Sequence, residues 1–331
     1  MKRGTFLHLA ASAIALFVTT EGGGAQTYPT RPVTVIEPIG VASVPDILIR
    51  IIAPRLSDIL GQPLVVENVV GAGGQIGASR VARGTPDGYR LLIGSISSQA
   101  FSQTLFKEPL YNSVTDFSPV ILLSEQSLVL VTGETLPTKH LQDFITYARQ
   151  NQSRMKYGAL AGTGSANHIA CALLNATIGV DVTEVPYRLP SATAYQDLIA
   201  GRIDYVCPNA SGDAKAHIDS GEFRGIAVFS KHRSPILPDV PTTYEQGLTD
   251  LEVSYWNAIF APKGTPQPIL KKLYSAFNDA IEAPDVRARL ETYGVEIVDH
   301  DRRSPEYLQA FVQSEIKKWA IPIKASGAAG Q

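Results

Sequence analysis

The stretch Val120–Val131, with the sequence VILLSEQSLVLV, has the apolar, β-branched composition of a long strand with a polar run, SEQS, at its middle. A second long apolar run, EVSYWNAIF, occupies Glu252–Phe260. Two long strands in one chain predict two lobes that are joined by two crossing segments. The C-terminal helices are then expected to belong to the first lobe. We therefore expect residues 26–124 and 250–331 to form lobe I, and residues 125–249 to form lobe II.

Outside these runs, short apolar strands alternate with amphipathic segments. Pro32–Ile36 is a β-branched run, and Ser43–Leu60 follows it with apolar residues at helical spacing. Ser43 or Val44 is the expected N-cap, Gly61 is the expected end, and Pro54 should kink or loosen the helix. Strands that alternate with single helices predict an α/β fold with parallel sheets wrapped by helices. The other expected strands are 64–67, 91–94, 156–160, 182–185, 203–207 and 226–229, and the other expected helices are 75–82, 141–149, 167–174, 192–200, 269–281, 284–293 and 305–318.

The composition is that of a folded globular protein. Of the 331 residues, 44% are apolar and 18% are charged, and the formal net charge is −2. A nearly neutral chain has no basic field to attract phosphates, so we expect no nucleic-acid partner.

The N-terminus has the three parts of a secretory signal peptide. Lys2 and Arg3 form a basic start, Phe6–Val18 is an almost uncharged apolar run, and small residues precede Gln26. The apolar run is too short to span a bilayer comfortably. We expect residues 1–25 to be a signal peptide cleaved near Ala25, and the mature protein to be soluble and periplasmic. The alternative for the N-terminal segment is an apolar helix of the core.

Cys171 and Cys207 are the two cysteines of the chain. Cys171 lies in a predicted helix and Cys207 ends a predicted strand, so both fit the pattern of small buried apolar residues. In an oxidising compartment the two could also pair. The sequence leaves both interpretations open.

Enzyme and cofactor motifs are incomplete in this sequence. Gly71-x-Gly73 follows a predicted strand, but Ile76 stands where a dinucleotide-binding loop has its third glycine. The histidines lack zinc-ligand spacing, and neither a phosphate-binding loop nor a G-x-S-x-G elbow occurs. Ser165 and His168 are the one candidate pair of nucleophile and base. We expect no catalytic site, no cofactor and no metal, and keep a hydrolase that uses Ser165 and His168 as an alternative.

Three loops combine small residues with the start of a helix or a turn, namely Glu37–Asp46, Gly162–His168 and Asn209–Asp213. In open α/β sheets, ligands bind at the carboxyl ends of strands, where helix N-termini also point. Free backbone amides and the positive helix end favour anions there, carboxylates in particular. For any single loop, tight turns alone are the simpler alternative.

Nine short stretches follow one another in a characteristic order. They are YPTRPV at 28–33, LGQPLVVEN at 60–68, GAGGQIG at 71–77, PDGYRLLIG at 86–94, VPYR at 185–188, LIAGRID at 198–204, SPILPDVPT at 234–242, YWNAIFAPKGTP at 255–266 and VRARL at 286–290. In this order they resemble the substrate-binding receptors of tripartite tricarboxylate transporters, the TctC or Bug family. The resemblance covers essentially all of the chain that follows the predicted signal peptide.

The resemblance implies a fold and a site. The implied fold is a type II-like periplasmic binding protein of the Venus-flytrap kind, with two α/β lobes, a hinge of two crossing strands and a carboxylated ligand in the cleft. In such receptors, main-chain amides and ordered waters of two loops hold one ligand carboxylate, and these loops correspond to Ile39–Asp46 and Gly162–His168. The implied ligand-binding residues are Ile39, Gly40, Ala42, Ser43, Asp46, Gly162, Thr163, Gly164, Ser165, His168, Tyr187 and Asn209.

The chain departs from the family pattern at two places. Ala42-Ser43 stands where relatives usually carry Gly-Gly, which could narrow the approach of the carboxylate. Pro208 stands where relatives often carry Asp, which removes a charge and makes a more apolar or less cationic ligand plausible.

The function implied by the resemblance is that of a periplasmic receptor. It would bind a small di- or tricarboxylic or aromatic acid as a monomer and deliver it to the membrane subunits of a tripartite tricarboxylate-type transporter. The alternative to delivery is a sensor that presents its ligand to a membrane kinase, because both roles use the same closed form.

Overall fold

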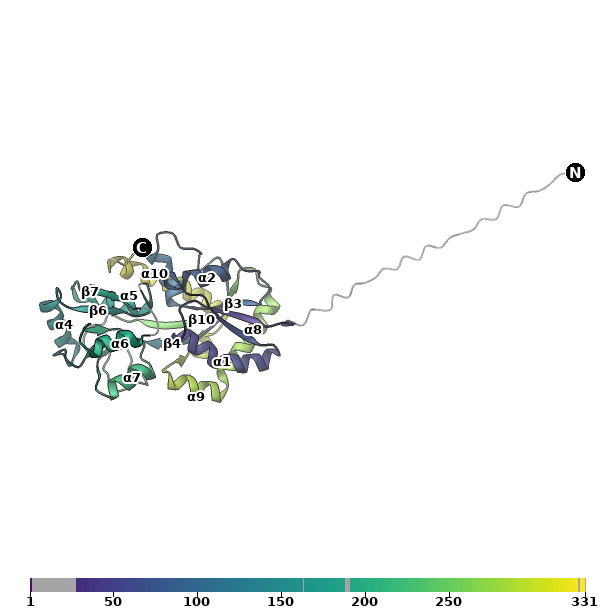
Figure 1. Cartoon of the computed structure of the whole chain (residues 1–331). Helices are drawn as coiled ribbons and strands as arrows, with labels where there is room; N and C mark the ends of the chain where they lie inside the picture. The colour runs from purple at the N-terminus through teal and green to yellow at the C-terminus, as the bar shows by residue number, and fades with distance from the viewer. Residues whose placement is uncertain (2–27, 163, 188–190, 327, 331) are drawn as a thin grey trace.

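The computed structural model describes residue 1 and residues 28–162, 164–187, 191–326 and 328–330. Most of the predicted signal peptide, Thr163 and Arg188 therefore lie outside the described residues. The chain forms two α/β lobes, each built on one sheet (Figure 1).

The first lobe is built on a six-stranded sheet of order β11-β4-β10-β3-β1-β2. Helices α1, α2, α8 and α10 pack on its strands, and α9 packs between α1, α8 and β11. The strands are β1 (Val33–Glu37), β2 (Leu64–Asn68), β3 (Arg90–Ser95), β4 (Phe117–Ser127), β10 (Ser254–Pro262) and β11 (Glu296–Ile297). The helices are α1 (Val44–Leu60), α2 (Gln75–Ala82), α3 (Ser102–Leu105), α8 (Gln267–Glu282), α9 (Pro284–Thr292) and α10 (Pro305–Ala325), with short turns of helix at Ala72–Gly74, Ser97–Phe101 and His300–Arg302.

The second lobe is built on a five-stranded sheet of order β7-β6-β8-β5-β9. Helices α4, α5, α6 and α7 pack on its strands. The strands are β5 (Val129–Gly133), β6 (Lys156–Ala159), β7 (Thr183–Pro186), β8 (Tyr205–Val206) and β9 (Phe223–Val228). The helices are α4 (Leu141–Asn151), α5 (Ala166–Ile178), α6 (Ala192–Ile199) and α7 (Gly212–Asp219).

The prediction of parallel sheets is wrong in part, because both sheets are mixed. Strand β1 is parallel to β2 and β3, and β6 is parallel to β7 and β8, as single-helix crossovers require. Strand β10, however, is antiparallel to β3 and β4, and β5 is antiparallel to β8 and β9. Strand β5 follows the outgoing crossing between the lobes, and β10 follows the returning one. At a crossing no single helix joins two strands of the same sheet, so the strands need not be parallel.

The predicted long strand at residues 120–131 is two strands that belong to different sheets. Strand β4 ends at Ser127, β5 begins at Val129, and the break falls at Leu128. The Phe229 amide donates a hydrogen bond to the Leu128 carbonyl (2.8 Å), and the Val253 amide donates one to the Phe229 carbonyl (3.0 Å). The outgoing and returning crossings thus lie side by side, as the hinge prediction expects. The division of the chain at residues 124/125 and 249/250 stays a prediction.

Helix α1 forms where its sequence signals place it. The Ser43 hydroxyl accepts a hydrogen bond from the Asp46 amide, and Gly61 ends the helix in the left-handed conformation at φ 69°. Pro54 lies inside the helix, which remains one continuous element through it. Leu48, Ile52 and Leu56 are fully buried, so one side of α1 packs into the core of the first lobe.

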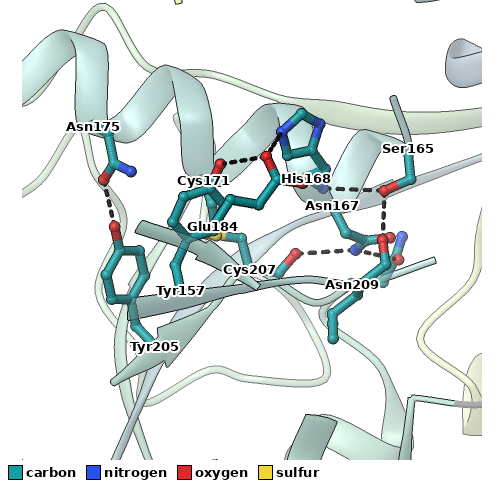
Figure 2. The surroundings of a disulfide bond; sticks show 11 residues. Tyr157, Ser165, Asn167, His168, Cys171, Asn175, Glu184, Tyr205, Cys207 and Asn209 are labelled. Atoms are coloured by element: carbon teal, nitrogen blue, oxygen red, sulfur yellow. Dashed lines mark hydrogen bonds and ion pairs between the residues drawn. A yellow bond between two sulfur atoms is a disulfide. The ribbon is translucent and has the colours of Figure 1, made fainter. Parts of the chain in front are cut away.

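Cys171 of α5 and Cys207, which follows β8, form a disulfide bond with their Cα atoms 5.7 Å apart. Both residues are also fully buried. The two cysteines are therefore both buried and paired, so the two interpretations that the sequence left open hold together. The bond holds α5 against the carboxyl end of β8 (Figure 2). None of the helices in the described ranges has the length and apolar character of a membrane span.

Candidate ligand-binding cleft

A cleft of about 680 Å³ lies between the lobes and is lined from both sides. The first lobe contributes the start of α1 together with β10 and the end of α9, and the second lobe contributes loops after β6 and β8 together with α6 and α7. The lining residues are Ile39, Ala42, Ser43, Val44, Ile47, Tyr255, Thr292, Tyr293 and Val295 of the first lobe, and Leu160, Ala161, Asn167, Ser191, Ala192, Tyr195, Gln196, Ile199, Pro208, Asn209, Ser211, Gly212, Asp213 and His217 of the second.

The first predicted loop is shaped by the buried carboxylate of Glu37. Its two oxygens accept hydrogen bonds from the amides of Ile39 (2.8 Å) and Gly40 (2.7 Å). They also accept from the Ser43 hydroxyl (3.1 Å) and from Asn68 Nδ2 (2.7 Å). Burial raises the pKa of Glu37, and these hydrogen bonds oppose that rise. The carboxylate thus acts as a template that fixes the conformation of the loop at Ile39–Asp46.

The predicted residues of this loop divide into two groups. Ile39, Ala42 and Ser43 line the cleft, whereas Gly40 and Asp46 are not among the lining residues. Asp46 accepts from the Ala42 amide and pairs with Arg50 at 2.9 Å, so it holds the loop from behind. Ala42 has a left-handed φ of 62°, a conformation that favours glycine.

Of the second predicted loop, Gly162–His168, Asn167 lines the cleft, and Leu160 and Ala161 line it just before the loop begins. Gly164, Ser165 and His168 are not among the lining residues. The Gly164 amide donates to His168 Nδ1 (3.0 Å), and His168 Nε2 lies 3.1 Å from the Glu184 carboxylate. His168 is buried and stacks on Tyr157. Gly162 is not a lining residue, and Thr163 lies outside the described residues.

Ser165 and His168 do not form a nucleophile–base pair. The Ser165 hydroxyl donates to the Leu160 carbonyl (2.5 Å) and accepts from the His168 backbone amide (3.1 Å). The imidazole nitrogens face Gly164 and Glu184 instead. Ser165 is the N-cap of α5, and His168 braces the loop, so the hydrolase alternative lacks its central contact.

Asn209 lines the cleft and carries an unpaired side-chain donor. Asn167 Nδ2 donates to Asn209 Oδ1 (3.1 Å) and to the Cys207 carbonyl (3.0 Å), which fixes the Asn209 amide group (Figure 2). Among the described residues, the buried Asn209 Nδ2 atom has no hydrogen-bond acceptor. A buried donor without an acceptor is costly, so this atom is suited to a ligand oxygen.

Tyr187 lies away from the lining surface. Its hydroxyl donates to Asp197 Oδ2 (2.6 Å), and burial followed by this contact raises the pKa of Tyr187. Its backbone carbonyl accepts from the Gly162 amide (2.8 Å). The backbone of Tyr187, just after β7, therefore holds the second loop through Gly162, while its side chain bonds to Asp197 of α6.

Sequence reasoning missed lining residues on both sides of the cleft. Tyr195 and Ile199 of α6, His217 of α7 and Tyr293 at the end of α9 all line the cleft. Helix α7 was not expected, although Ser211 before Gly212-Asp213 is a regular N-cap signal and its hydroxyl accepts from the Ala214 amide. With that signal, the candidate loop at Asn209–Asp213 would have been extended to His217.

Gln126 links the two lobes beside the cleft. Its Nε2 donates to the Ala210 carbonyl of the second lobe (2.8 Å) and to the Tyr293 carbonyl of the first (3.0 Å). Gly294, the residue after Tyr293, approaches the second lobe so closely that a Cβ on it would stand 2.4 Å from the Ala210 oxygen. The lobes are therefore in direct backbone contact beside the hinge.

We expect Gln126→Leu to lower the free energy of unfolding by about 2 kcal/mol, because the Ala210 and Tyr293 carbonyls lose their donor. Urea denaturation measures the change. Gln313→Leu on the exposed face of α10 is the control and should stay within about 0.5 kcal/mol of wild type. Equal stabilities of the two variants would contradict the bridging role of Gln126.

Comparison with known proteins identifies the group to which this chain is related. The profile of the tripartite tricarboxylate transporter family receptor, TctC, matches residues 48–328. The chain belongs to this family. It is accordingly a solute-binding receptor and not an enzyme, and the resemblance noted in the sequence is confirmed.

Three relatives illustrate the match. A UPF0065 protein from the TAR-I ttuE-ttuC' intergenic region of Agrobacterium vitis is 36% identical over 302 residues, which cover 91% of this chain and 86% of the relative. The structure of MatC from Rhodopseudomonas palustris with bound malate is 34% identical with a TM-score of 0.82, covering 89% of this chain and all of MatC. The structure of R. palustris Rpa4515 with adipate is 33% identical with a TM-score of 0.83, covering 92% and 100%. These likenesses also confirm the two-lobe periplasmic binding protein fold.

Proposed function

We propose that this receptor is exported to the periplasm, closes its lobes on a small carboxylate and delivers it as a monomer to the membrane subunits of a tripartite tricarboxylate-type transporter. The N-terminal basic, apolar and small-residue segments support export. The two side-by-side crossings beside Gln126 support closure by a hinge motion.

The unpaired donor of Asn209 carries the proposal. In the described part of the chain, the amides of Val44 and Gly212 at the starts of α1 and α7 likewise have no acceptor. All three residues line the same cleft, and the two helices direct their positive ends to it. Donors without acceptors at two helix N-termini favour a bound anion, and a carboxylate provides two acceptor oxygens.

Two relatives of similar fold support the ligand class. MatC holds malate, and Rpa4515 holds adipate. Both ligands are small dicarboxylates, and a cleft of about 680 Å³ has room for such acids or for an aromatic acid. We therefore propose di- and tricarboxylic and aromatic acids as the ligands to be tested first.

Calorimetric titration of the mature protein, residues 26–331, against these acids tests the proposal. We expect at least one acid to bind with a single site and to raise the melting temperature, because ligand binding stabilises the folded state. A panel in which every acid fails both measurements would contradict the proposal.

Asn209→Ala is expected to weaken binding of that acid about tenfold or more, the usual effect of losing a hydrogen bond to a charged group. Asn209→Asp keeps the shape but places a negative charge beside the carboxylate, and it should weaken binding further. Circular dichroism checks that both variants fold. Affinities equal to wild type in both variants would remove Asn209 from the site.

A further inference from the structure

A second cavity, of about 600 Å³, lies between the lobes on another side of α7 and α9. Helix α7 of the second lobe and α9 of the first lie next to each other, and a Cβ on Gly212 would stand 2.5 Å from the Thr292 oxygen (Figure 1). On α7, Asp213 and His217 line the cleft, whereas Lys215 between them lines the second cavity, because residues two apart on a helix face different ways. We call this second cavity the back groove.

The second-lobe wall of the back groove is mainly apolar. Pro235, Ile236 and Pro238 follow β9 and line the groove. The side chain of Ile236 reaches the first lobe, since its Cγ2 atom lies 3.1 Å from the place that a Cβ on Gly294 would take. A concave surface of proline and branched aliphatic side chains is suited to the hydrocarbon body of a small ligand.

The first-lobe wall carries two carboxylates without partners. Glu291 of α9 and Glu296 of β11 both line the groove, and neither carboxylate has an ion-pair or hydrogen-bond partner among the described residues. Glu291 lies in the last turn of α9, whose negative end adds to its charge. Burial, and after it the Glu125 carboxylate on the neighbouring strand, raises the pKa of Glu296. A cation beside Glu296 would oppose this rise, because an opposite charge favours the ionised form.

The two basic residues of the groove are already paired. Lys215 lies 2.7 Å from Asp219, and Arg287 lies 2.9 Å from Glu282. Neither of these two acids lines the groove. The unpaired charge of the groove is therefore negative, and it favours a cation over an anion.

We propose that the back groove is a second binding site, which takes a small organic cation with an apolar body. The ammonium group is held by Glu291 and Glu296, and the hydrocarbon body packs on the wall of Pro235, Ile236 and Pro238. This site goes beyond the proposed function, because it requires no carboxylate in the cleft.

Calorimetric titration of the mature protein with hexylamine, hexan-1-ol and ethylamine at neutral pH tests the site. We expect hexylamine to bind at least about tenfold more tightly than either of the other two. Hexan-1-ol lacks the charge that the carboxylates recognise, and ethylamine lacks most of the apolar chain. Absence of hexylamine binding, or equal binding of hexylamine and hexan-1-ol, would overturn the proposal.

Variants assign hexylamine to one of the two cavities. Glu291→Gln combined with Glu296→Gln should weaken its binding at least about tenfold. Asp213→Asn, which changes a carboxylate of the cleft, should leave the binding of hexylamine unchanged. Asp58→Asn is the surface control, because Asp58 is exposed on α1 and lines neither cavity. Binding that is lost in Asp213→Asn and survives the double Glu→Gln change would overturn the proposal.

The two proposed sites can fail separately. Asn209→Ala changes the carboxylate cleft and should leave hexylamine binding as in wild type. If no acid binds but hexylamine does, the proposed function fails and the back groove stands. If an acid binds and hexylamine does not, the proposed function stands and the back groove is excluded as a cation site.

Discussion

Replacing Glu37 with leucine is expected to lower the free energy of unfolding by about 4 kcal/mol or more and to abolish measurable carboxylate binding. The reason is that the Ile39 and Gly40 amides, the Ser43 hydroxyl and Asn68 Nδ2 all donate to the Glu37 carboxylate. Leucine fills the space but accepts nothing, and each buried donor that loses its partner costs about 1 kcal/mol or more. Urea denaturation and ligand titration measure the two effects.

Glu67→Gln is the matched control for this change. Glu67 lies on β2 and forms an exposed ion pair with Arg80, so its loss should cost less than about 1 kcal/mol. If Glu37→Leu were as stable as Glu67→Gln and still bound ligand, Glu37 would not be the template of the loop.

Glu37→Gln adds a test of pH dependence. Burial raises the pKa of Glu37 in the folded protein, so the folded state holds this proton to higher pH than the unfolded chain does. The contribution of Glu37 is therefore complete below its unfolded pKa and declines as the pH rises through its folded pKa. The free energy of unfolding of the wild type, taken relative to that of Glu37→Gln, should therefore fall over that interval of pH. Urea titrations at successive pH values measure this change. A wild type that gains stability relative to Glu37→Gln as the pH rises would contradict this assignment.

The parts of the fold that local chemistry determines could be predicted from the sequence. Helix α1 follows directly from Ser43, Pro45 and Gly61, since each supplies a local capping or starting signal. The break between β4 and β5 could not be located in this way. Ser124 and Gln126 are polar but buried and remain in β4, while the break falls at the apolar Leu128. Hydropathy indicates burial, and it carries no information on which sheet supplies the neighbouring strand.

The candidate site shows the same division. Ile39, Ser43 and Asn209 follow strands or begin helices, and the loops that contain them do line the cleft. Tyr195 and His217 reach the cleft only because the lobes bring α6 and α7 opposite α1, and Tyr293 lines the cleft because α9 packs beside α1 in the first lobe. Such a meeting depends on the packing of distant segments, and no spacing along the chain records it.

The disulfide also depends on packing between distant segments. Cys171 and Cys207 are 36 residues apart and each reads as a buried apolar residue, so their meeting required the placement of α5 against the end of β8. We expect the double substitution Cys171→Ala and Cys207→Ala to lower the free energy of unfolding by about 3–4 kcal/mol, the chain-entropy effect of opening a loop of this length. Urea denaturation with and without dithiothreitol measures the change.

The same substitution should weaken ligand binding, because the bond lies beside the contacts that orient Asn209. The Cys207 carbonyl accepts from Asn167 Nδ2, and the same Nδ2 group donates to Asn209 Oδ1. Without the bond, α5 and the end of β8 can shift apart, and ordering them again on binding costs conformational entropy. Dithiothreitol should therefore reduce both stability and affinity in the wild type and leave the double variant unchanged. A wild type whose unfolding midpoint and affinity do not respond to complete reduction would show that packing alone holds α5 in place.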